Sequence, residues 1–267
     1  MSDIRTQFFL LSKDIVHSIT NWHFWVTLAW NDVLKQYRRS LVGPLWISLN
    51  TAIFISSFGY LGAQLFKFKV ETYIPYFCSG QIIFGLISNW LTEGCATYVA
   101  AEGFLKQSSY SKLSFVLRVV FRNLLMFSHN LAVMIGVLLF FDQLHNIQWI
   151  NFIMGLSMVT LVGCFLVAII ALVATRFRDV PMIVASAMQV LFFVTPVIWR
   201  SDQLNNDLRD FILYNPLATL IDIVRNPLLG HPVSTELWIA SGVIFLILVP
   251  IFWVAYLLGR RRIVYWL

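Results

Sequence analysis

Few residues that could do covalent chemistry stand near one another in this sequence. The five histidines are scattered, and Asp142 and His145, which stand close together, have no further acid beside them. The odd set of Cys78, Cys95 and Cys164 gives neither a disulfide framework nor a metal spacing. The chain also lacks a Gly-x-Ser-x-Gly nucleophile motif and a Gly-x-x-x-x-Gly-Lys-Ser/Thr phosphate cradle. We therefore expect no catalytic residue, no metal site and no ATP site of its own.

Polar side chains inside long apolar stretches are more informative, since each is costly in a membrane unless it faces protein or water. Glu93 is the only acid among them, and it either snorkels to the interface, pairs with a nearby arginine or serves transport. The amides either join helices or line a pathway. Aromatic residues, 16% of the chain, belong to interfacial belts and packing or to a route for a sugar chain. The polar residues in these stretches are Asn50, Gln64, Gln81, Asn89, Glu93, Asn130 and Gln189.

The composition places these residues in a membrane protein. Hydrophobic residues make up 59% of the 267 and charged residues only 12%, with a mean hydropathy of +0.76. A soluble domain carries roughly 25% charged residues, so the polar surface needed in water is missing. Segments of about ten residues with alternating polarity are absent, which argues against a membrane β-barrel.

Six apolar segments are long enough to cross a bilayer, which takes about 20 predominantly apolar residues. We expect one all-α integral membrane domain, with residues 1–40 as an N-terminal cytoplasmic and interface segment, 41–258 as a six-helix bundle and 259–267 as a cytoplasmic tail. The predicted spans are Leu41–Phe66, Ile74–Tyr98, Phe115–Phe141, Trp149–Thr175, Pro181–Trp199 and Leu237–Leu258.

Basic residues gather on one side of these spans. Fourteen of the 19 lysines and arginines precede the first span, flank the third, connect the fourth to the fifth or follow the sixth. Cytoplasmic loops are enriched in lysine and arginine, so both termini are predicted to be cytoplasmic. The net charge of +6 reflects this bias and attraction to anionic headgroups, so we expect membrane lipids as partners and no nucleic acid.

Two segments outside the spans carry further patterns. Apolar and aromatic residues recur at helical spacing over Trp22–Tyr37, which predicts an amphipathic helix lying in the membrane interface. Between Thr195 and Glu236, two apolar pieces too short to span alternate with polar turns, a pattern typical of re-entrant or surface half-helices. The residues that define the interface helix and its basic end are Trp22, Trp25, Tyr37, Arg38 and Arg39.

Four stretches, spread nearly from end to end, resemble the membrane subunit of an ABC-2-type polysaccharide exporter. That family moves O-antigen, capsule and teichoic-acid chains. Each stretch alone is weak, and their order together with the topology makes the resemblance specific. They are Lys35–Trp46, Thr195–Ile198, Tyr214–Leu217 followed by Arg225, and Arg262–Trp266.

The resemblance implies a homodimer in the bacterial cytoplasmic (inner) membrane, exporting a lipid-linked polysaccharide, with O-antigen favoured over capsule or teichoic acid. Two copies of a separate ABC ATPase would bind ATP and Mg, so this chain would hold no cofactor. By similarity, Ala101–Ser114 holds a coupling helix and Arg176–Asp179 makes a second contact. The expected ATPase contacts are Glu102, Phe104, Lys106, Tyr110, Arg176, Arg178 and Asp179.

The channel wall and the outer gate are expected to use residues of the spans and of the segment after the fifth span. A drug or lipid exporter would share this topology, and a membrane-embedded transferase would need a cluster of acids or histidines. An ion channel would need a glycine-rich filter or a ring of acids. The expected channel and gate residues are Trp46, Asn50, Gln81, Asn89, Gln189, Phe192, Phe193, Pro196, Trp199, Tyr214, Asn215, Pro216 and Arg225.

Overall fold

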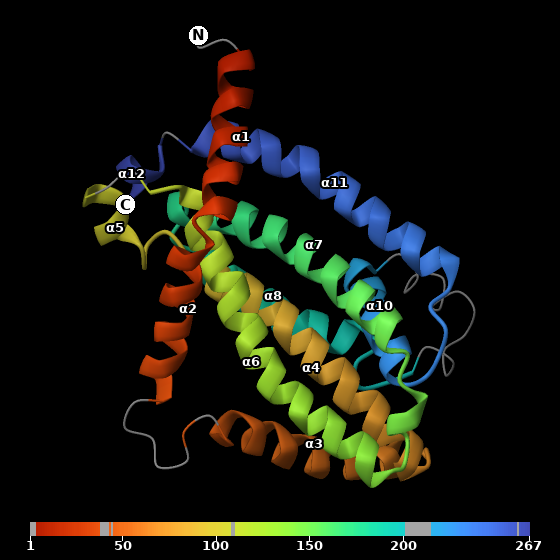
Figure 1. Cartoon of the computed structure of the whole chain (residues 1–267). Coiled ribbons are helices and arrows are strands. Elements are labelled where there is room, and N and C mark those ends of the chain that lie inside the picture. Colours follow the sequence, from red (N-terminus) through yellow and green to blue (C-terminus); the bar gives the residue numbers. More distant parts are fainter. Residues whose placement is uncertain (1–3, 38–42, 44, 108–109, 201–214, 261) are drawn as a thin grey trace.

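The computed structural model describes residues 4–37, 43, 45–107, 110–200, 215–260 and 262–267, without the side chains of residues 4–11, 37 and 45. This described part is built from helices and contains no strand (Figure 1). The helices are α1 Ile4–Thr20, α2 Trp22–Tyr37, α3 Leu45–Leu65, α4 Val70–Gly94, α5 Glu102–Gln107, α6 Lys112–Phe140, η1 Leu144–Asn146, α7 Trp149–Arg176, α8 Val180–Val194, α10 Pro216–Leu228, α11 Thr235–Gly259 and α12 Ile263–Trp266.

The all-helical prediction is confirmed. Among the described residues, α6, α7 and α11 are both long and apolar enough to cross a membrane. Helices α3 and α4 have 21 and 25 residues and carry more polar side chains, whereas α8 is apolar and has 15 residues. The count of six spans stays a prediction.

Two helices differ in their bounds from the predicted spans, which were approximate. Helix α4 begins and ends four residues before the predicted Ile74–Tyr98, with Glu71 in its first turn, where an acid is favourable near the positive end of the helix dipole. Helix α8 ends at Val194, five residues before the predicted end. Thr195 has an extended backbone, φ −87° and ψ 141°, because a residue that precedes a proline is pushed out of the helical region.

The N-terminal segment forms two helices, of which the sequence predicted the second. Helix α2 spans the predicted Trp22–Tyr37, whereas α1 was not expected. The carboxylate of Asp14 in α1 accepts a hydrogen bond from Tyr256 Oη at 2.7 Å. It also forms an ion pair with Arg260 Nε at 2.9 Å. These contacts attach α1 to the C-terminal end of α11, which lies beside it at the top of Figure 1.

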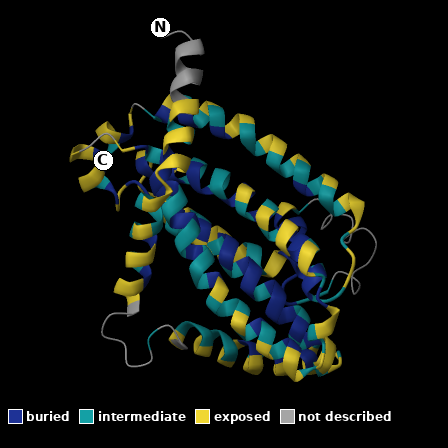
Figure 2. Ribbon diagram, viewed as in Figure 1, coloured by how far each residue is buried: buried dark blue, intermediate teal, exposed yellow. Residues whose placement is uncertain are grey.

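Helix α4 lies at the centre of the bundle and packs against α3, α6, α7 and α10. Figure 2 shows burial concentrated on α4 and the helices around it, while α3 and α11 are mostly exposed or half-exposed. Trp90 of α4 is fully buried, and its ring occupies the space left by Gly163 of α7, where a Cβ would lie 2.5 Å from ring atoms. The Trp90 indole donates to the backbone oxygen of Val120 at 3.2 Å, which ties α4 to α6.

Candidate functional site

A groove between α4 and α8 combines amides, hydroxyls and aromatic rings. Its cavity has a volume of about 500 Å³, and Phe54 of α3 borders it. Five of the residues expected in the channel wall lie together here, two on α4 and three on α8. The lining residues are Phe54, Gln81, Phe84, Gly85, Ser88, Asn89, Thr92, Ala185, Met188, Gln189, Phe192 and Phe193.

The groove offers two kinds of contact to a ligand. The rings of Phe84 and Phe192 lie 5.2 Å apart between centroids, and Phe193 follows at 5.4 Å from Phe192. Within the described part of the chain, Gln81 Oε1 is buried and has no hydrogen-bond partner. Aromatic faces beside amides and hydroxyls can bind a sugar ring, whose C–H face is apolar and whose edge is polar.

Two expected channel residues lie elsewhere. Trp46 and Asn50 are exposed residues of α3 and do not line the groove. Helix α8 itself is poorly covered, since Met188 is its one buried residue within the described structure. Large apolar side chains of α8 such as Ile183 and Val190 are therefore more than half exposed.

Arg225 of α10 holds the turn that follows α8. Its side chain is 2% exposed, and Nη1 donates to the backbone oxygen of Pro196 at 2.8 Å. Asp222 accepts from Nε at 3.0 Å and also from Nη2, while the guanidinium lies 4.1 Å from the ring centroid of Tyr76. Burial by itself lowers the pKa of Arg225, but Asp222 and Tyr76 raise it above the ordinary value, so the side chain stays charged.

Tyrosines of α4 hold the same turn from the other side. Tyr73 Oη donates to Ile198 O at 2.6 Å, and Tyr76 Oη lies 3.1 Å from Pro196 O and 3.2 Å from Trp199 O. The predicted gate residues Pro196, Trp199 and Arg225 are thus brought together.

Asn215 and Pro216 begin α10 beside this turn. Asn215 Oδ1 accepts from the Leu217 backbone N–H at 3.0 Å, and its Nδ2 donates to Thr195 Oγ1 at 3.1 Å. Pro216 occupies the first turn, where a missing N–H costs little. Helix α10 has 13 residues, which is too short to span, and its re-entrant placement stays a prediction. The predicted gate residue Tyr214 lies outside the described residues.

Comparison with known proteins shows which family this chain matches. Residues 23–229, from α2 through α10, match the family described as ABC-2 type transporter. The chain belongs to the ABC-2 type transporter family. Two curated proteins of Klebsiella pneumoniae, both described as O-antigen export system permease protein RfbA, are each 21% identical to it over 232 residues. Each match covers 85% of this chain and 90% of the relative.

The predicted coupling residues of this ABC-2 transporter chain lie in two neighbouring places. Glu102 and Lys106 pair along α5 at 2.5 Å and are both half-exposed. The rings of Phe104 and Tyr110 contact Phe24 of α2, with the Phe24 and Tyr110 rings stacked at 4.4 Å between centroids. Phe104 of α5 and Tyr110 are therefore attached to α2, the predicted interface helix.

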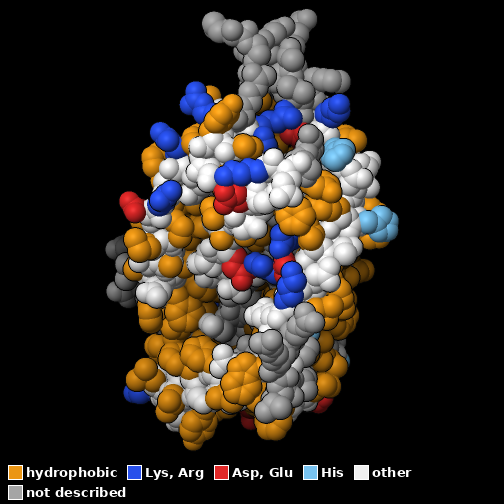
Figure 3. Space-filling model, turned by 90° about the vertical axis from the view of Figure 1, so that its left-hand side faces the viewer, with side chains coloured by type: hydrophobic (Ala, Val, Ile, Leu, Met, Phe, Trp, Pro, Cys, Tyr) orange, Lys and Arg blue, Asp and Glu red, His pale blue; other side chains and the backbone are white. Residues whose placement is uncertain are grey.

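The second predicted contact follows α7 in the same ABC-2 chain. Arg176 lies 5.7 Å from the ring of Trp266 in α12, and α12 also packs against α5. Arg178 and Asp179 are exposed in the turn before α8. Figure 3 shows lysine and arginine side chains concentrated in the upper part of one face, above a largely hydrophobic lower part.

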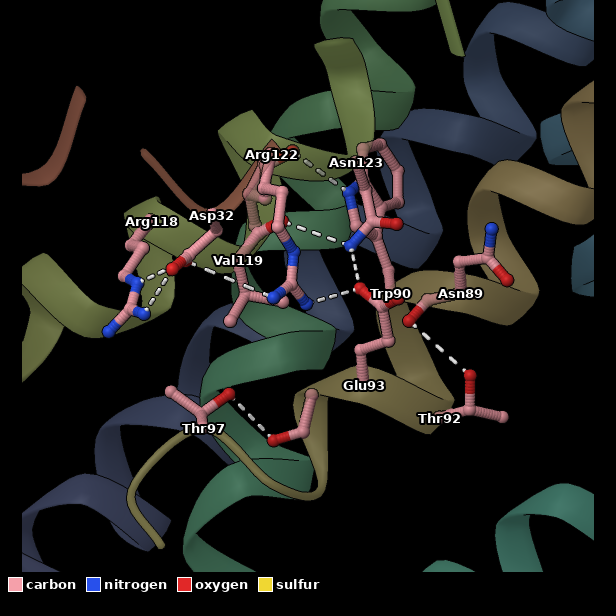
Figure 4. Close-up of polar contacts among 12 residues, drawn as sticks. Asp32, Asn89, Trp90, Thr92, Glu93, Thr97, Arg118, Val119, Arg122 and Asn123 are labelled. Atoms are coloured by element: carbon pink, nitrogen blue, oxygen red, sulfur yellow. Dashed lines mark hydrogen bonds and ion pairs between the residues drawn. The ribbon is translucent and has the colours of Figure 1, made fainter. Parts of the chain in front are cut away.

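An ion-pair network joins three helices of the ABC-2 fold (Figure 4). Glu93 of α4 accepts from Arg122 at 2.5 Å and from Asn123 at 2.6 Å, both on α6. This confirms pairing of Glu93 with a nearby arginine. Asp32 of α2 binds Arg118 of α6 through two hydrogen bonds of 2.6 and 2.7 Å.

Sequence reasoning missed Asp32 and grouped the two arginines only with the basic flank. Asp32 precedes the first predicted span, and its local sequence gives no signal of a partner 86 positions away. Of the residues predicted for the interface helix, Trp22 is exposed and Trp25 half-buried, and the side chain of Tyr37 lies outside the description, as do Arg38 and Arg39.

Proposed function

We propose that this chain is the membrane subunit of an ATP-driven exporter that moves a lipid-linked polysaccharide, with O-antigen the expected cargo, across the bacterial cytoplasmic membrane. The groove between α4 and α8 carries the proposal, since it lines one face of the chain with rings and amides suited to sugars. Similarity to the O-antigen export permeases over most of both chains supports the same cargo.

The proposed assembly is a homodimer with two ABC ATPase subunits, which bind ATP and Mg. The poorly covered apolar surface of α8 supports a second copy of the chain, because an exposed apolar helix beside a polar groove favours a facing partner over lipid alone. Both termini lie in the cytoplasm in this arrangement, and six helices cross the membrane. The one-sided distribution of basic residues supports that orientation.

In the proposed mechanism, ATP binding brings the ATPases together and moves α5 and the turn after α7. Phe104 of α5 and Tyr110, which follows α5, both contact Phe24 of α2, so motion of the coupling loop reaches the interface helix. The glycan enters from the inner leaflet, follows the groove and leaves past the Pro196–Trp199 turn. Opening of this gate requires release of contacts that Arg225, Tyr73 and Tyr76 make with the turn.

The test is an ATPase measurement on the complex purified from native membranes through a tag on this chain. We expect a separate ATPase in about equal amount, with hydrolysis stimulated by lipid-linked polysaccharide and unaffected by the lipid carrier without its glycan. Stimulation by drugs or simple lipids, with no response to the glycan, would establish the drug or lipid exporter instead. Purification of the chain without any ATPase would contradict an ABC exporter.

A further inference from the structure

Asp32 of α2 lies across two arginines of α6. Arg118 Nε and Nη2 each donate to one oxygen of the Asp32 carboxylate, and Arg122 Nη1 lies 3.9 Å from the same carboxylate. The side chains are mostly buried, with 18% of Arg118, 26% of Arg122 and 13% of Asp32 exposed. Arg118 and Arg122 are four positions apart, so their side chains leave the same face of α6.

The two arginines depend on different helices for their charge balance. Arg122 is held by Glu93 of α4, which Asn123 also binds, so this pair stays within the bundle. The bidentate partner of Arg118 comes from α2, outside the inner bundle. Movement of α2 would therefore leave Arg118 partly buried without its carboxylate, which is a costly state.

Around Asp32, α2 has one covered side and one exposed side. Ala29 and Val33 are buried, while Trp30 and Leu34, each the next residue along the helix, are about half exposed. The N-terminal half of α2 has contacts of its own, since the Trp25 indole donates to Ser18 O at 2.9 Å and the Phe24 ring stacks on Tyr110. These contacts do not involve Asp32 or its arginines.

We propose that Arg118 and Arg122 form a binding site for a phosphate group, which Asp32 occupies as an internal substitute in this conformation. The guanidinium fork of arginine binds carboxylate and phosphate with the same two parallel hydrogen bonds. A phosphate carries more charge than Asp32 and three oxygens, so it can reach Arg118 and Arg122 together. Exchange of Asp32 for a phosphate would release the C-terminal half of α2 from α6.

The phosphate belongs either to a lipid headgroup or to a free ion. If the phosphate is the headgroup of the exported lipid, the site is part of the proposed export function and this interpretation rests on that function. As a binding site it stands apart from transport, because its test needs neither an ATPase nor a glycan. If no phosphate binds, the export proposal still stands. If the chain exports no glycan, the phosphate site still stands.

Binding is measured on the purified chain in detergent by native mass spectrometry, with dioctanoyl phosphatidic acid as the lipid phosphate, dioctanoylglycerol as the lipid without phosphate, and inorganic phosphate alone. Asp32→Asn keeps the size of the side chain and removes its charge. It should strengthen phosphatidic acid binding about tenfold, by removing a charged competitor. Arg118→Gln in the Asp32→Asn background should abolish the gain. Dioctanoylglycerol should show no response in either variant.

Asp14→Asn is the matched control, because Asp14 also pairs with an arginine, Arg260, of another helix. An equal gain in Asp14→Asn, or a gain that survives Arg118→Gln, would overturn the site. Response to inorganic phosphate alone would assign a free ion, and response to phosphatidic acid alone a lipid. If Asp32→Asn does not fold, Arg118→Gln in the unmodified chain decides the matter: its phosphatidic acid binding must fall, and unchanged binding overturns the proposal.

Discussion

Arg225 is among the largest side chains that the fold buries completely, and every part of its guanidinium is used. One edge binds Asp222, another binds the backbone oxygen of Pro196, and the flat face covers Tyr76. Gly80 of α4 leaves room for this head, since a Cβ there would lie 3.1 Å from Nη1. Arginine thus connects α4, α10 and the turn after α8 in a way that lysine, with its compact ammonium, cannot reproduce.

Replacing Arg225 should destabilise the protein. Arg225→Met leaves Asp222 and the oxygen of Pro196 without their cation, at a cost of about 3 kcal/mol. Arg225→Lys should recover only part of that loss. Thermal unfolding of the detergent-purified chain measures both, with exposed Arg178→Met as the control. Equal melting temperatures for the Arg225→Met and Arg178→Met variants would contradict this role of Arg225.

Single residues were predictable from sequence only where a motif or a rule pointed to them. Arg225 was identified by the resemblance, and Glu93 by the rule that an acid in an apolar stretch needs a partner. Their partners were not predictable, because Pro196 is 29 positions from Arg225 and Arg122 is 29 from Glu93. Asp32 lay outside every rule applied, since its arginine is provided by the packing of two helices.

Close approach between helices depends on two glycines of α7. Gly163 accommodates the ring of Trp90, and Gly155 accommodates the backbone of α10, where a Cβ would lie 2.4 Å from Ile223 O. A ring can turn aside, whereas a helix backbone must move as a unit. Gly155 therefore sets the distance between α7 and α10, and through α10 the position of Arg225.

Gly155→Ala should push α10 away from α7 and cost about 1–3 kcal/mol, the usual range for overpacking. Gly136→Ala is the control within α6, since a Cβ there meets nothing within 4 Å. Alanine at that position should leave stability unchanged or raise it slightly, because glycine is a poor helix residue. Thermal unfolding distinguishes the two variants. A Gly155→Ala variant as stable as the control would mean that α10 has room to shift.

Elements were predicted well where one rule acted alone. The amphipathic pattern of α2 and the start of α7 at Trp149 agree with the sequence prediction. The length of the apolar stretch did not predict the ends of α4 and α8. Helix α4 begins with an acid in its first turn, and α8 ends before a residue that precedes a proline. Helix α1 was missed because its apolar residues are interrupted by Lys13 and Asp14. Within the described structure, the carboxylate of Asp14 finds its partners at the C-terminal end of α11.

At the scale of the whole molecule, two regions that would meet the ATPases lie close together. Helix α12 packs against both α5 and α7, so the predicted coupling helix and the turn after α7 share a neighbour. The groove and the gate lie on α4, α8 and α10, away from these contacts. Transport would require movement to pass along the long helices that connect the two regions.

Replacing Phe104 or Lys106 should uncouple ATP hydrolysis from export while the complex stays assembled. Phe104→Ala removes a ring that packs against Phe24 of α2, and Lys106→Ala removes the ion pair with Glu102 on exposed α5. Export and hydrolysis are measured together in reconstituted vesicles, with Lys69→Ala, which lies on the other side of the predicted spans, as control. Normal export by both variants would remove α5 from the coupling assignment.

The family could be predicted because its motifs are local in sequence, and the groove could be predicted in part because five amides and rings of the spans line it together. Trp46 and Asn50 lie outside the groove, because packing sets how α3 is rotated about its axis, and the length of a span does not encode that rotation. The ion-pair network and the attachment of α1 were out of reach for the same reason.

The bond between Asp14 and Arg260 also bears on how the protein is made. The two residues are 246 positions apart, so α1 leaves the ribosome long before the end of α11 that holds it. Its carboxylate stays without these two partners until Tyr256 and Arg260 have been synthesised. The attachment of α1 is therefore a late event of biogenesis. It follows the synthesis of the helices that lie between Asp14 and Arg260 in the sequence.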